Sequence, residues 1–383
     1  IDVQQFAMRR MEGESAAAVV MDVTNGDLIA IASAPGFDPN LFNLGLPQSV
    51  WDELQSNERK PLLSKAIAGQ YPPGSTFKMV VAHAAIEAGV MSANETVFCG
   101  GKTRLGNHDF HCWKRGGHGS MNMRLALKHS CDVYFYEAAK RVGIDGIHDM
   151  AKRFGLGQTY EIGFPDEKPG LVPSKGWKIA NTGETWQRGE TLIAGIGQGF
   201  LLATPLQLAV MTARLANGGK AVTPRIVRSV GDDPVPYVQP ESIRLCEFAM
   251  QVIPRGLSAV SNEAGGTAYG SRIPDPGLEL AGKTGTSQVR RITAAERAAG
   301  IIANEDLPWN RRDHALFVAF APYEAPRYAI SVFVEHGGGG SRAAAPIARD
   351  IMRETLRLDP AGRAAISPVA ERAPSPGRDA GEG

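Results

Sequence analysis

The sequence predicts an α+β fold in which one antiparallel sheet is packed by helices and lies beside an all-helical lobe. Hairpins near the two ends of the chain predict the sheet. In each hairpin two apolar, β-branched runs flank a short turn, which is Asn-Gly in the first; the runs cover residues 16–23 and 28–33, then 316–323 and 328–336. Most of the chain between the hairpins shows helical periodicity. Strands at both ends with helices between them are typical of an α+β domain.

Four segments show this helical pattern clearly. They are the run that follows Ser75, residues 123–143, residues 204–219, and a terminal helix over residues 345–356. The last of these follows four consecutive glycines, residues 337–340.

The composition indicates a globular protein that does not bind nucleic acid. The chain has 383 residues, 43% of them hydrophobic, and can bury one large core or two ordinary ones. Its 41 Lys and Arg residues balance 40 Asp and Glu residues, so the positive field of a nucleic-acid binder is missing. No stretch reaches the roughly 18 apolar residues of a membrane span, and no signal peptide is recognisable. Because the chain begins with Ile1, we expect a fragment of a longer protein.

Ser75 and Lys78 stand at the start of an apolar helical run, directly after a Pro-Pro-Gly turn. At a helix N-terminus, unpaired backbone N–H groups and the helix dipole favour developing negative charge on a serine. Lys78, one turn later, falls on the same face. A lysine desolvated by apolar neighbours has a lowered pKa and can take a serine proton. The pair therefore fits a nucleophile and its base, although Ser-x-x-Lys alone is more often a helix cap beside a solvated lysine.

Two further motifs make that common alternative improbable. Ser130 and Asp132 stand in a predicted helical segment, and a predicted strand carries the run Lys283, Thr284, Gly285 and Thr286. Ser-x-x-Lys, Ser-x-Asn and Lys-Thr-Gly in this order are the known signature of penicillin-binding proteins and class A β-lactamases. The chance assembly of all three motifs in one chain is improbable.

Longer stretches resemble the transpeptidase domain of class B penicillin-binding proteins, and most closely the elongation type. The resemblance covers about residues 1–357 and is carried by segments such as AGQYPPGSTFK, WKRGGHG, SCDVYFY, ETLIAGIGQGFLLATPLQLA and GKTGTSQV. It implies a transpeptidase domain over residues 14–358, preceded by a remnant of a link over residues 1–13. Residues 359–383, rich in Pro, Gly, Ala and charge, are expected to form a disordered tail. One departure is Asp132, because the wider superfamily has asparagine there.

The resemblance also implies roles for the motif residues. Ser75 would attack the penultimate D-Ala carbonyl of a peptidoglycan stem peptide, and Lys78 would accept its proton. Ser130 would pass a proton to the departing D-Ala, and Asp132 would make the polar contact of the second motif. Lys283, Thr284 and Thr286 would hold the substrate carboxylate, while Gly285 would let the strand lie close to the ligand. Backbone N–H groups of Ser75 and Thr286 would form the oxyanion hole, and β-lactams would acylate the same serine.

Two other readings of the same motifs remain open. A serine β-lactamase must also speed the attack of water on the acyl-enzyme, and no residue is assignable to that task. A β-lactam-sensing receptor domain would acylate and signal without catalysis. Both families usually have shorter domains, and neither accounts for the long segment over residues 160–210.

Three of the four cysteines crowd into a short part of the chain and predict a zinc site. Cys99, Cys112, His118 and Cys131 are separated by twelve, five and twelve residues, and three thiolates with one imidazole are a standard tetrahedral zinc set. His108 or His111 could replace His118. A Cys99–Cys112 disulfide and simple buried thiols are the alternatives. Cys246 is expected to be a core residue.

By resemblance, the full-length protein would be anchored in the cytoplasmic membrane and would work on its periplasmic face. We expect this anchor to lie outside the given residues. Its partners would be a RodA-type glycan polymerase and an MreC-type scaffold. The acceptor amine, the antibiotic affinities and the oligomeric state do not follow from the sequence.

Overall fold

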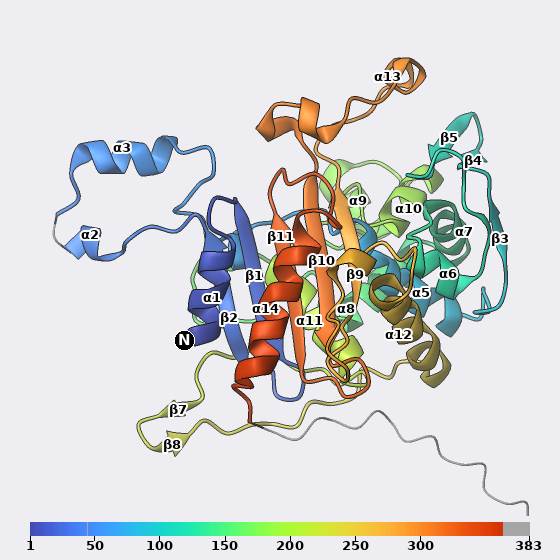
Figure 1. Cartoon of the computed structure of the whole chain (residues 1–383). Coiled ribbons are helices and arrows are strands. Elements are labelled where there is room, and N and C mark those ends of the chain that lie inside the picture. Colours follow the sequence, from blue (N-terminus) through green and yellow to red (C-terminus); the bar gives the residue numbers. More distant parts are fainter. Residues whose placement is uncertain (44, 363–383) are drawn as a thin grey trace, which may run out of the picture.

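A five-stranded antiparallel sheet forms the centre of the molecule, with the strand order β2-β1-β11-β10-β9 (Figure 1). The structure is a computed structural model that describes residues 1–43 and 45–362. The sheet strands are β1 (Ala16–Asp22), β2 (Leu28–Ala34), β9 (Ala281–Ser287), β10 (His314–Ala321) and β11 (Tyr328–Val334). Both predicted hairpins are present, and the predicted α+β fold is confirmed.

The two predicted hairpins pair with each other across the sheet. β1 lies against β11 with Ala16 opposite Val334 and Asp22 opposite Tyr328. The two ends of the chain therefore form one continuous layer. Gly26 in the turn between β1 and β2 has φ +79°, a conformation that glycine adopts without strain.

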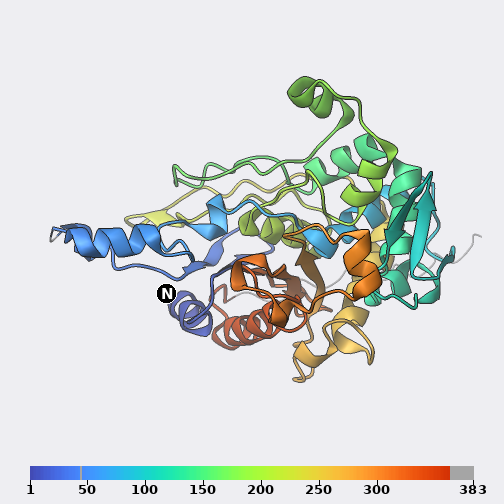
Figure 2. The ribbon, with the colours of Figure 1, turned by 90° about the horizontal axis from the view of Figure 1, so that it is seen from above.

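Helices cover both faces of this sheet. On one face α1 (Asp2–Arg10) and α14 (Ala344–Leu358) lie side by side (Figure 2), while α11 (Pro205–Ala216) packs on β1, β10 and β11 from the other face. Every residue of β1 and β11 is consequently buried. Residues 1–13, expected to be a remnant of a link, thus contain a helix whose Val3 and Ala7 belong to the core.

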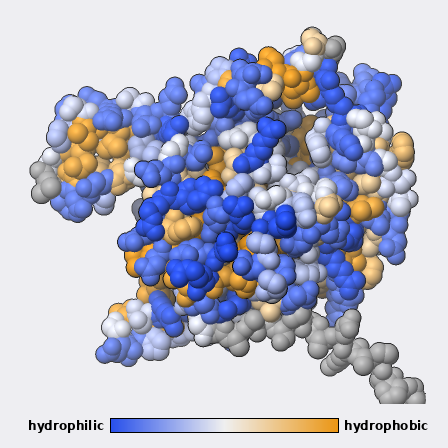
Figure 3. All heavy atoms as spheres, in the orientation of Figure 1, coloured by the Kyte–Doolittle hydropathy of each residue, from blue (hydrophilic) through white to orange (hydrophobic). Residues whose placement is uncertain are grey.

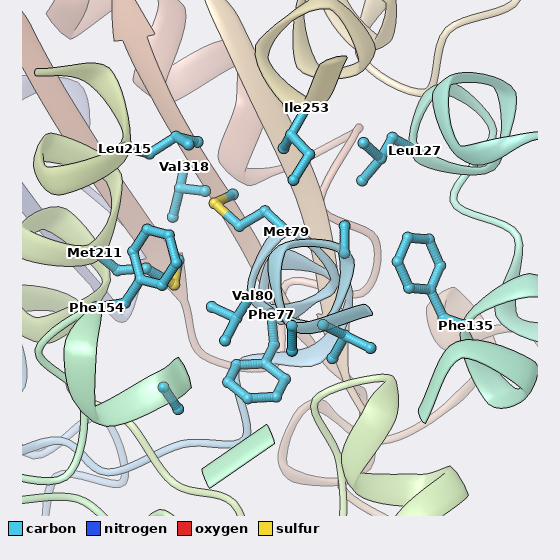
Figure 4. Packing of buried hydrophobic residues seen from close by; sticks show 14 of the residues in the cluster. Phe77, Met79, Val80, Leu127, Phe135, Phe154, Met211, Leu215, Ile253 and Val318 are labelled. Atoms are coloured by element: carbon cyan, nitrogen blue, oxygen red, sulfur yellow. The ribbon is translucent and has the colours of Figure 1, made fainter. Parts of the chain in front are cut away.

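The helical lobe is built around α5 (Lys78–Glu87), which is buried from Lys78 to Ala85. A helix that is apolar on all sides needs cover on all sides. Figure 4 shows this cover, with labelled side chains from several elements around Met79 and Val80: Leu127, Phe135, Phe154, Met211, Leu215, Ile253 and Val318. The helices that contact α5 are α6 (Met123–Lys128), α7 (Asp132–Val142), α8 (Ile144–Arg153) and α12 (Glu247–Asn262). α10 (Arg188–Gly195) packs on α7 and α8, whereas α4 (Lys65–Ala68) packs on β1, β2 and α11.

The single helix predicted over residues 123–143 is wrong, because the structure has two helices there. α6 ends at Lys128 and α7 begins at Asp132. Between them Ser130 has φ +55°, a left-handed conformation that interrupts an α-helix of L-residues. The second motif therefore lies at the break between two helices.

Several short strands and helices lie outside the central sheet and the helical lobe. Two small ladders join β3 (Val97–Cys99) to β6 (Gly119–Met121) and β4 (Lys102–Leu105) to β5 (His108–His111). The peripheral elements are α2 (Asn40–Asn43), α3 (Gln48–Ser56), α9 (Lys175–Thr182), α13 (Ala294–Ala299), β7 (Ser229–Val230) and β8 (Asp233–Pro234). Short 3-10 helices are η1 (Gly74–Phe77), η2 (Tyr269–Ser271), η3 (Asn304–Asp306) and η4 (Trp309–Arg311).

The arm that carries α2 and α3 projects from the body and exposes apolar surface. Figure 3 shows this surface in orange, and Phe37 and Phe42 are among the exposed side chains of the arm. No helix in the described part of the chain is both long and apolar enough to cross a membrane. Of the tail predicted over residues 359–383, residues 363–383 lie outside the described residues.

Candidate active site

Ser75 lies in η1, the 3-10 turn immediately ahead of α5, and not in the α-helix itself. Gly74 before it has φ +53°, and its N–H donates to the carbonyl of Gly197 at 2.8 Å. A Cβ at Gly74 would lie 2.4 Å from the carbonyl oxygen of Thr286. Only glycine therefore lets the Ser75 turn lie directly against β9, the strand that carries the third motif.

Tyr71 anchors the chain that leads into this turn. Its backbone pairs with Ala203 in both directions, at 3.0 and 2.9 Å, and its ring stacks on Phe333 with 3.7 Å between centroids. Its hydroxyl donates to Glu335 Oε1 at 2.8 Å. Burial, together with the Glu335 carboxylate, raises the pKa of Tyr71, so the hydroxyl keeps its proton for this bond. Glu335 follows directly after β11.

Lys78 is fully buried and its charge is matched by Asp132. The Lys78 ammonium donates to Asp132 Oδ1 at 2.6 Å and to the Ser130 carbonyl at 2.9 Å, and it lies 3.3 Å from Ser130 Oγ. A buried charge is tolerated when it is paired and hydrogen-bonded in this way. Asp132, which replaces the asparagine of the wider superfamily, therefore makes an ion pair with Lys78 of the first motif.

Lys283 approaches the same hydroxyl from β9. Its Nζ donates to Ser130 Oγ at 2.9 Å and to the Thr284 carbonyl at 3.1 Å. Burial, and next the neighbouring charge of Lys78, lower the pKa of Lys283 well below its ordinary value, although Asp132 opposes this shift. The Ser130 hydroxyl thus lies between two buried lysine nitrogens.

The other third-motif residues line a cleft that Ser75 also faces. The cleft has a volume of about 1300 Å³ and is lined in part by Ser75, Ser130, Asp132, Thr284, Gly285 and Thr286. A Cβ at Gly285 would lie 2.9 Å from Thr76 Cγ2, so β9 and η1 are in close contact there too. Gln198 Nε2 donates to the Thr286 carbonyl at 2.8 Å and holds the strand from the cleft side.

Besides Gln198, Trp113 and Thr267 contact the motifs and were not predicted. The Trp113 backbone N–H donates to Asp132 Oδ2 at 2.8 Å, and its indole N–H donates to the Ser130 carbonyl at 3.0 Å. Thr267 Oγ1 and Thr284 Oγ1 are 2.8 Å apart. The only sequence signal for Trp113 was its place in the family-like segment WKRGGHG, and Thr267 had none.

The predicted metal ligands come together next to the second motif. The ligand atoms of Cys99, Cys112, His118 and Cys131 all lie within 4.8 Å of one another. His118 Nδ1 is 3.6 Å from Cys99 Sγ and 3.5 Å from Cys112 Sγ. A sulfur and a nitrogen on one tetrahedral zinc ion are about 3.6 Å apart, given the usual bond lengths.

The donor set therefore fits zinc in type and in spacing. The hydrogen bond between the two thiols lowers the pKa of Cys112, and the same bond together with burial raises the pKa of Cys131. All four cysteines are free thiols. Cys246 lies apart from the cluster as the half-buried residue ahead of α12, and His108 and His111 lie on β5 outside the cluster.

A comparison with known protein families agrees with this geometry. The sequence profile described as the penicillin binding protein transpeptidase domain matches residues 16–353. The chain belongs to this family. It is 34% identical to the peptidoglycan D,D-transpeptidase MrdA of Haemophilus influenzae over 359 residues, which is 91% of this chain and 54% of that protein. It is also 34% identical to MrdA of Escherichia coli K12, covering 93% of this chain and 56% of that protein.

Solved structures of penicillin-binding protein 2 have the same fold. The structure from Pseudomonas aeruginosa in complex with WCK 5153 superposes with a TM-score of 0.83 at 36% identity, covering 93% of this chain and 77% of that chain. The complex of penicillin-binding protein 2 and MreC from Helicobacter pylori gives a TM-score of 0.82 at 33% identity, covering 93% of this chain and 63% of that chain. The predicted resemblance to penicillin-binding protein 2 is confirmed. The chain spans about half the length of the curated relatives it matches.

Proposed function

We propose that this chain is a peptidoglycan D,D-transpeptidase that cross-links stem peptides through a serine acyl-enzyme during cell elongation. The observation that carries the proposal is the environment of Ser130, whose hydroxyl lies 3.3 Å from Lys78 Nζ and 2.9 Å from Lys283 Nζ in the cleft that Ser75 also lines. Such a network can move protons at a reacting serine. Curated relatives that are named for this activity support it.

In the acylation step Ser75 Oγ attacks the carbonyl carbon of the penultimate D-Ala. Lys78 acts as the general base that takes the serine proton, and Asp132 fixes the position of the lysine nitrogen at 2.6 Å. The backbone N–H groups of Ser75 and Thr286 stabilise the oxyanion, an interaction worth about 3 kcal/mol per donor in other acyl-transfer enzymes. Their close approach is supported by the contact of Gly74 with Thr286.

As the C–N bond breaks, the terminal D-Ala leaves as an amine that needs a proton. Ser130 supplies this proton from its hydroxyl, and the neighbouring lysines, Lys78 and Lys283, return a proton to it. Protonated Lys283, with Thr284 and Thr286, holds the terminal carboxylate, and that negative charge itself favours protonation of the lysine. An amine of a neighbouring strand then attacks the ester carbonyl, which forms the cross-link and returns the proton to Ser75.

A β-lactam would acylate Ser75 by the same route and remain attached. One neighbour in the structural comparison, penicillin-binding protein A from M. tuberculosis, was solved as an imipenem acyl-enzyme complex, with 25% identity and a TM-score of 0.74.

Turnover of a chromogenic cephalosporin separates the proposed transpeptidase from a β-lactamase. We expect a burst of about one equivalent per chain followed by very slow turnover, since we assign no residue in the described part of the chain to the activation of water against the acyl-enzyme. Steady turnover of many equivalents would indicate a β-lactamase instead. A receptor domain would give the same burst, but it would release no D-Ala from a peptide donor in the presence of an acceptor amine.

We further propose that Cys99, Cys112, His118 and Cys131 hold a structural zinc ion. The support is the close clustering of their ligand atoms and the place of Cys131 between Ser130 and Asp132. Zinc would supply no chemistry to the acyl transfer. Its part would be to fix the loop whose Trp113 donates hydrogen bonds to Asp132 and Ser130.

The cellular context is proposed from relatives alone. A full-length protein of this kind would act on the periplasmic face of the cytoplasmic membrane with a RodA-type polymerase and an MreC-type scaffold. One similar structure is a complex with MreC, and another is a peptidoglycan synthase complex that coordinates polymerization and crosslinking.

A further inference from the structure

Two segments that are far apart in the sequence meet over one side of the active-site cleft. One is the loop that carries β4, β5 and Arg115, and the other is the connection between β9 and β10 that carries α13. Arg115 Nη2 donates to the Arg297 carbonyl at 2.9 Å, and Figures 1 and 2 both place α13 beside the β4–β5 hairpin. Both segments contribute lining residues to the cleft.

Most acidic side chains that line the cleft are neutralised by a cation. Asp109 pairs with Lys102 at 2.6 Å and with Arg104 at 2.7 Å. Asp132 pairs with Lys78, and Glu190 pairs with Lys178 at 2.6 Å. These carboxylates therefore contribute little net negative charge to the cleft.

The remaining acidic residue of the lining, Asp313, binds groups of its own chain. Its carboxylate accepts hydrogen bonds from the Val289 N–H at 3.2 Å and from Asn304 Nδ2 at 3.5 Å. The charge of Asp313 also acts on Arg290, whose side chain pairs with Glu296.

Three arginines that line the cleft have no ion-pair partner among the described residues. Arg115, Arg291 and Arg297 form no ion pair with any residue that the structure describes. The nearest candidate in sequence, Glu296, is already held by both terminal nitrogens of Arg290 at 2.7 and 2.6 Å. The cleft wall on this side therefore carries unbalanced positive charge, and after burial the charge of Arg297 is the largest factor that lowers the pKa of His111.

We propose that Arg115, Arg291 and Arg297 form an anion subsite that takes a free carboxylate of the donor peptide, on a residue that precedes its terminal D-Ala-D-Ala. The inference rests on the proposed function. With its D-Ala carbonyl at Ser75, the rest of a donor peptide must run along the same cleft. Guanidinium groups bind carboxylates in a bidentate manner, and a cleft lined by one sign of charge concentrates ligands of the opposite sign. The preferred donor is thus an acidic peptide.

The test compares two synthetic donors that share a D-Ala-D-Ala end. One carries free carboxylates on the preceding residues, and the other carries primary amides at the same positions. We expect D-Ala release with kcat/KM at least about tenfold higher for the acidic donor, mainly through a lower KM. In the Arg115→Ala/Arg297→Ala double variant the two donors should become nearly equal, because only the acidic donor loses its partner.

A matched control and an independent reaction make the test decisive. Arg104→Ala removes a cation from the same cleft, but one that already forms an ion pair with Asp109, so the preference for the acidic donor should remain. Equal rates for both donors in the unaltered protein, or an equal loss of preference in Arg104→Ala, would overturn the subsite. Acylation by benzylpenicillin, measured in every variant, tests the proposed function separately, because this small ligand needs only the Ser75 end of the cleft.

Discussion

Ser130 is the residue on which the proposed chemistry converges. Its left-handed backbone, φ +55°, costs a non-glycine residue about 1–2 kcal/mol. This conformation directs its carbonyl to Lys78 and Trp113 and its hydroxyl to Lys283. Strain at a residue with so many functional contacts is consistent with a catalytic position.

Replacing each lysine by arginine separates their proposed roles. Lys78→Arg keeps a positive charge but cannot readily lose a proton, so we expect the penicillin acylation rate to fall by about two orders of magnitude or more. Lys283→Arg keeps a cation near the substrate carboxylate, and its rate should fall about tenfold or less. The measurement is the second-order rate constant of acylation for each variant.

The stability of both variants must be measured together with their acylation rates, because both lysines are buried and arginine is larger. Thermal unfolding midpoints show whether each variant is folded at the assay temperature. Folded variants that acylate at equal rates would contradict the division of roles between Lys78 and Lys283.

At this scale the sequence could predict the motif residues but not their neighbours. Ser75, Lys78, Ser130 and Lys283 belong to short patterns with a known chemical meaning. Trp113 and Thr267 reach the site only through the fold, and no local pattern marks a backbone N–H that will meet a carboxylate 19 residues away.

Among the elements, the segment between β3 and α7 connects the proposed metal site to the second motif. Cys112 precedes Trp113, and Cys131 separates Ser130 from Asp132. A metal bound to Cys112 and Cys131 would hold Trp113, the donor of these hydrogen bonds, and Ser130 and Asp132, their acceptors, in place. Loss of metal should therefore affect acylation although none of the four ligands has a part in the proposed acyl transfer.

Cys112→Ser tests this connection. Protein purified without added metal should contain about one zinc ion per chain by elemental analysis, and the variant should contain almost none. We expect the acylation rate of the variant to fall together with its zinc content. Cys246→Ser is the matched control, because Cys246 lies outside the cluster, and it should keep both. A metal-free wild-type protein that acylates at the full rate would refute the structural role.

The regular elements were predictable where the pattern is long, and the breaks were not. Both hairpins, α11 and α14 follow from apolar periodicity and turn residues, and α5 follows from a long apolar run after a turn. The interruption of the predicted helix at Ser130 has no such signal, because a single left-handed residue leaves the apolar periodicity on both sides intact. The short strands β3 to β6 are also too brief to show alternation.

At the scale of the whole molecule, strand order places the active site. β9 pairs with β10 with Lys283 opposite Val318, and η1 packs on β9, so the first and third motifs face each other across the end of α5. The sequence predicts both hairpins but not the pairings of β1 with β11 and of β9 with β10, because many pairings bury the same apolar residues. The resemblance to a known family, and not the hydrophobic pattern, implied that Ser75 and Thr286 meet at one oxyanion hole.

The central claim is that Ser75 alone forms the acyl-enzyme, and intact mass after incubation with benzylpenicillin tests it most directly. Opening of the β-lactam ring expels no atoms, so the chain should gain the full mass of one antibiotic molecule, and peptide mapping should place it on the peptide that contains Ser75. Ser75→Ala should gain no mass while remaining folded, and Ser49→Ala, an exposed serine of α3, should label like the unaltered protein. Labelling of Ser75→Ala at the wild-type level, or a modified peptide that lacks Ser75, would contradict the account.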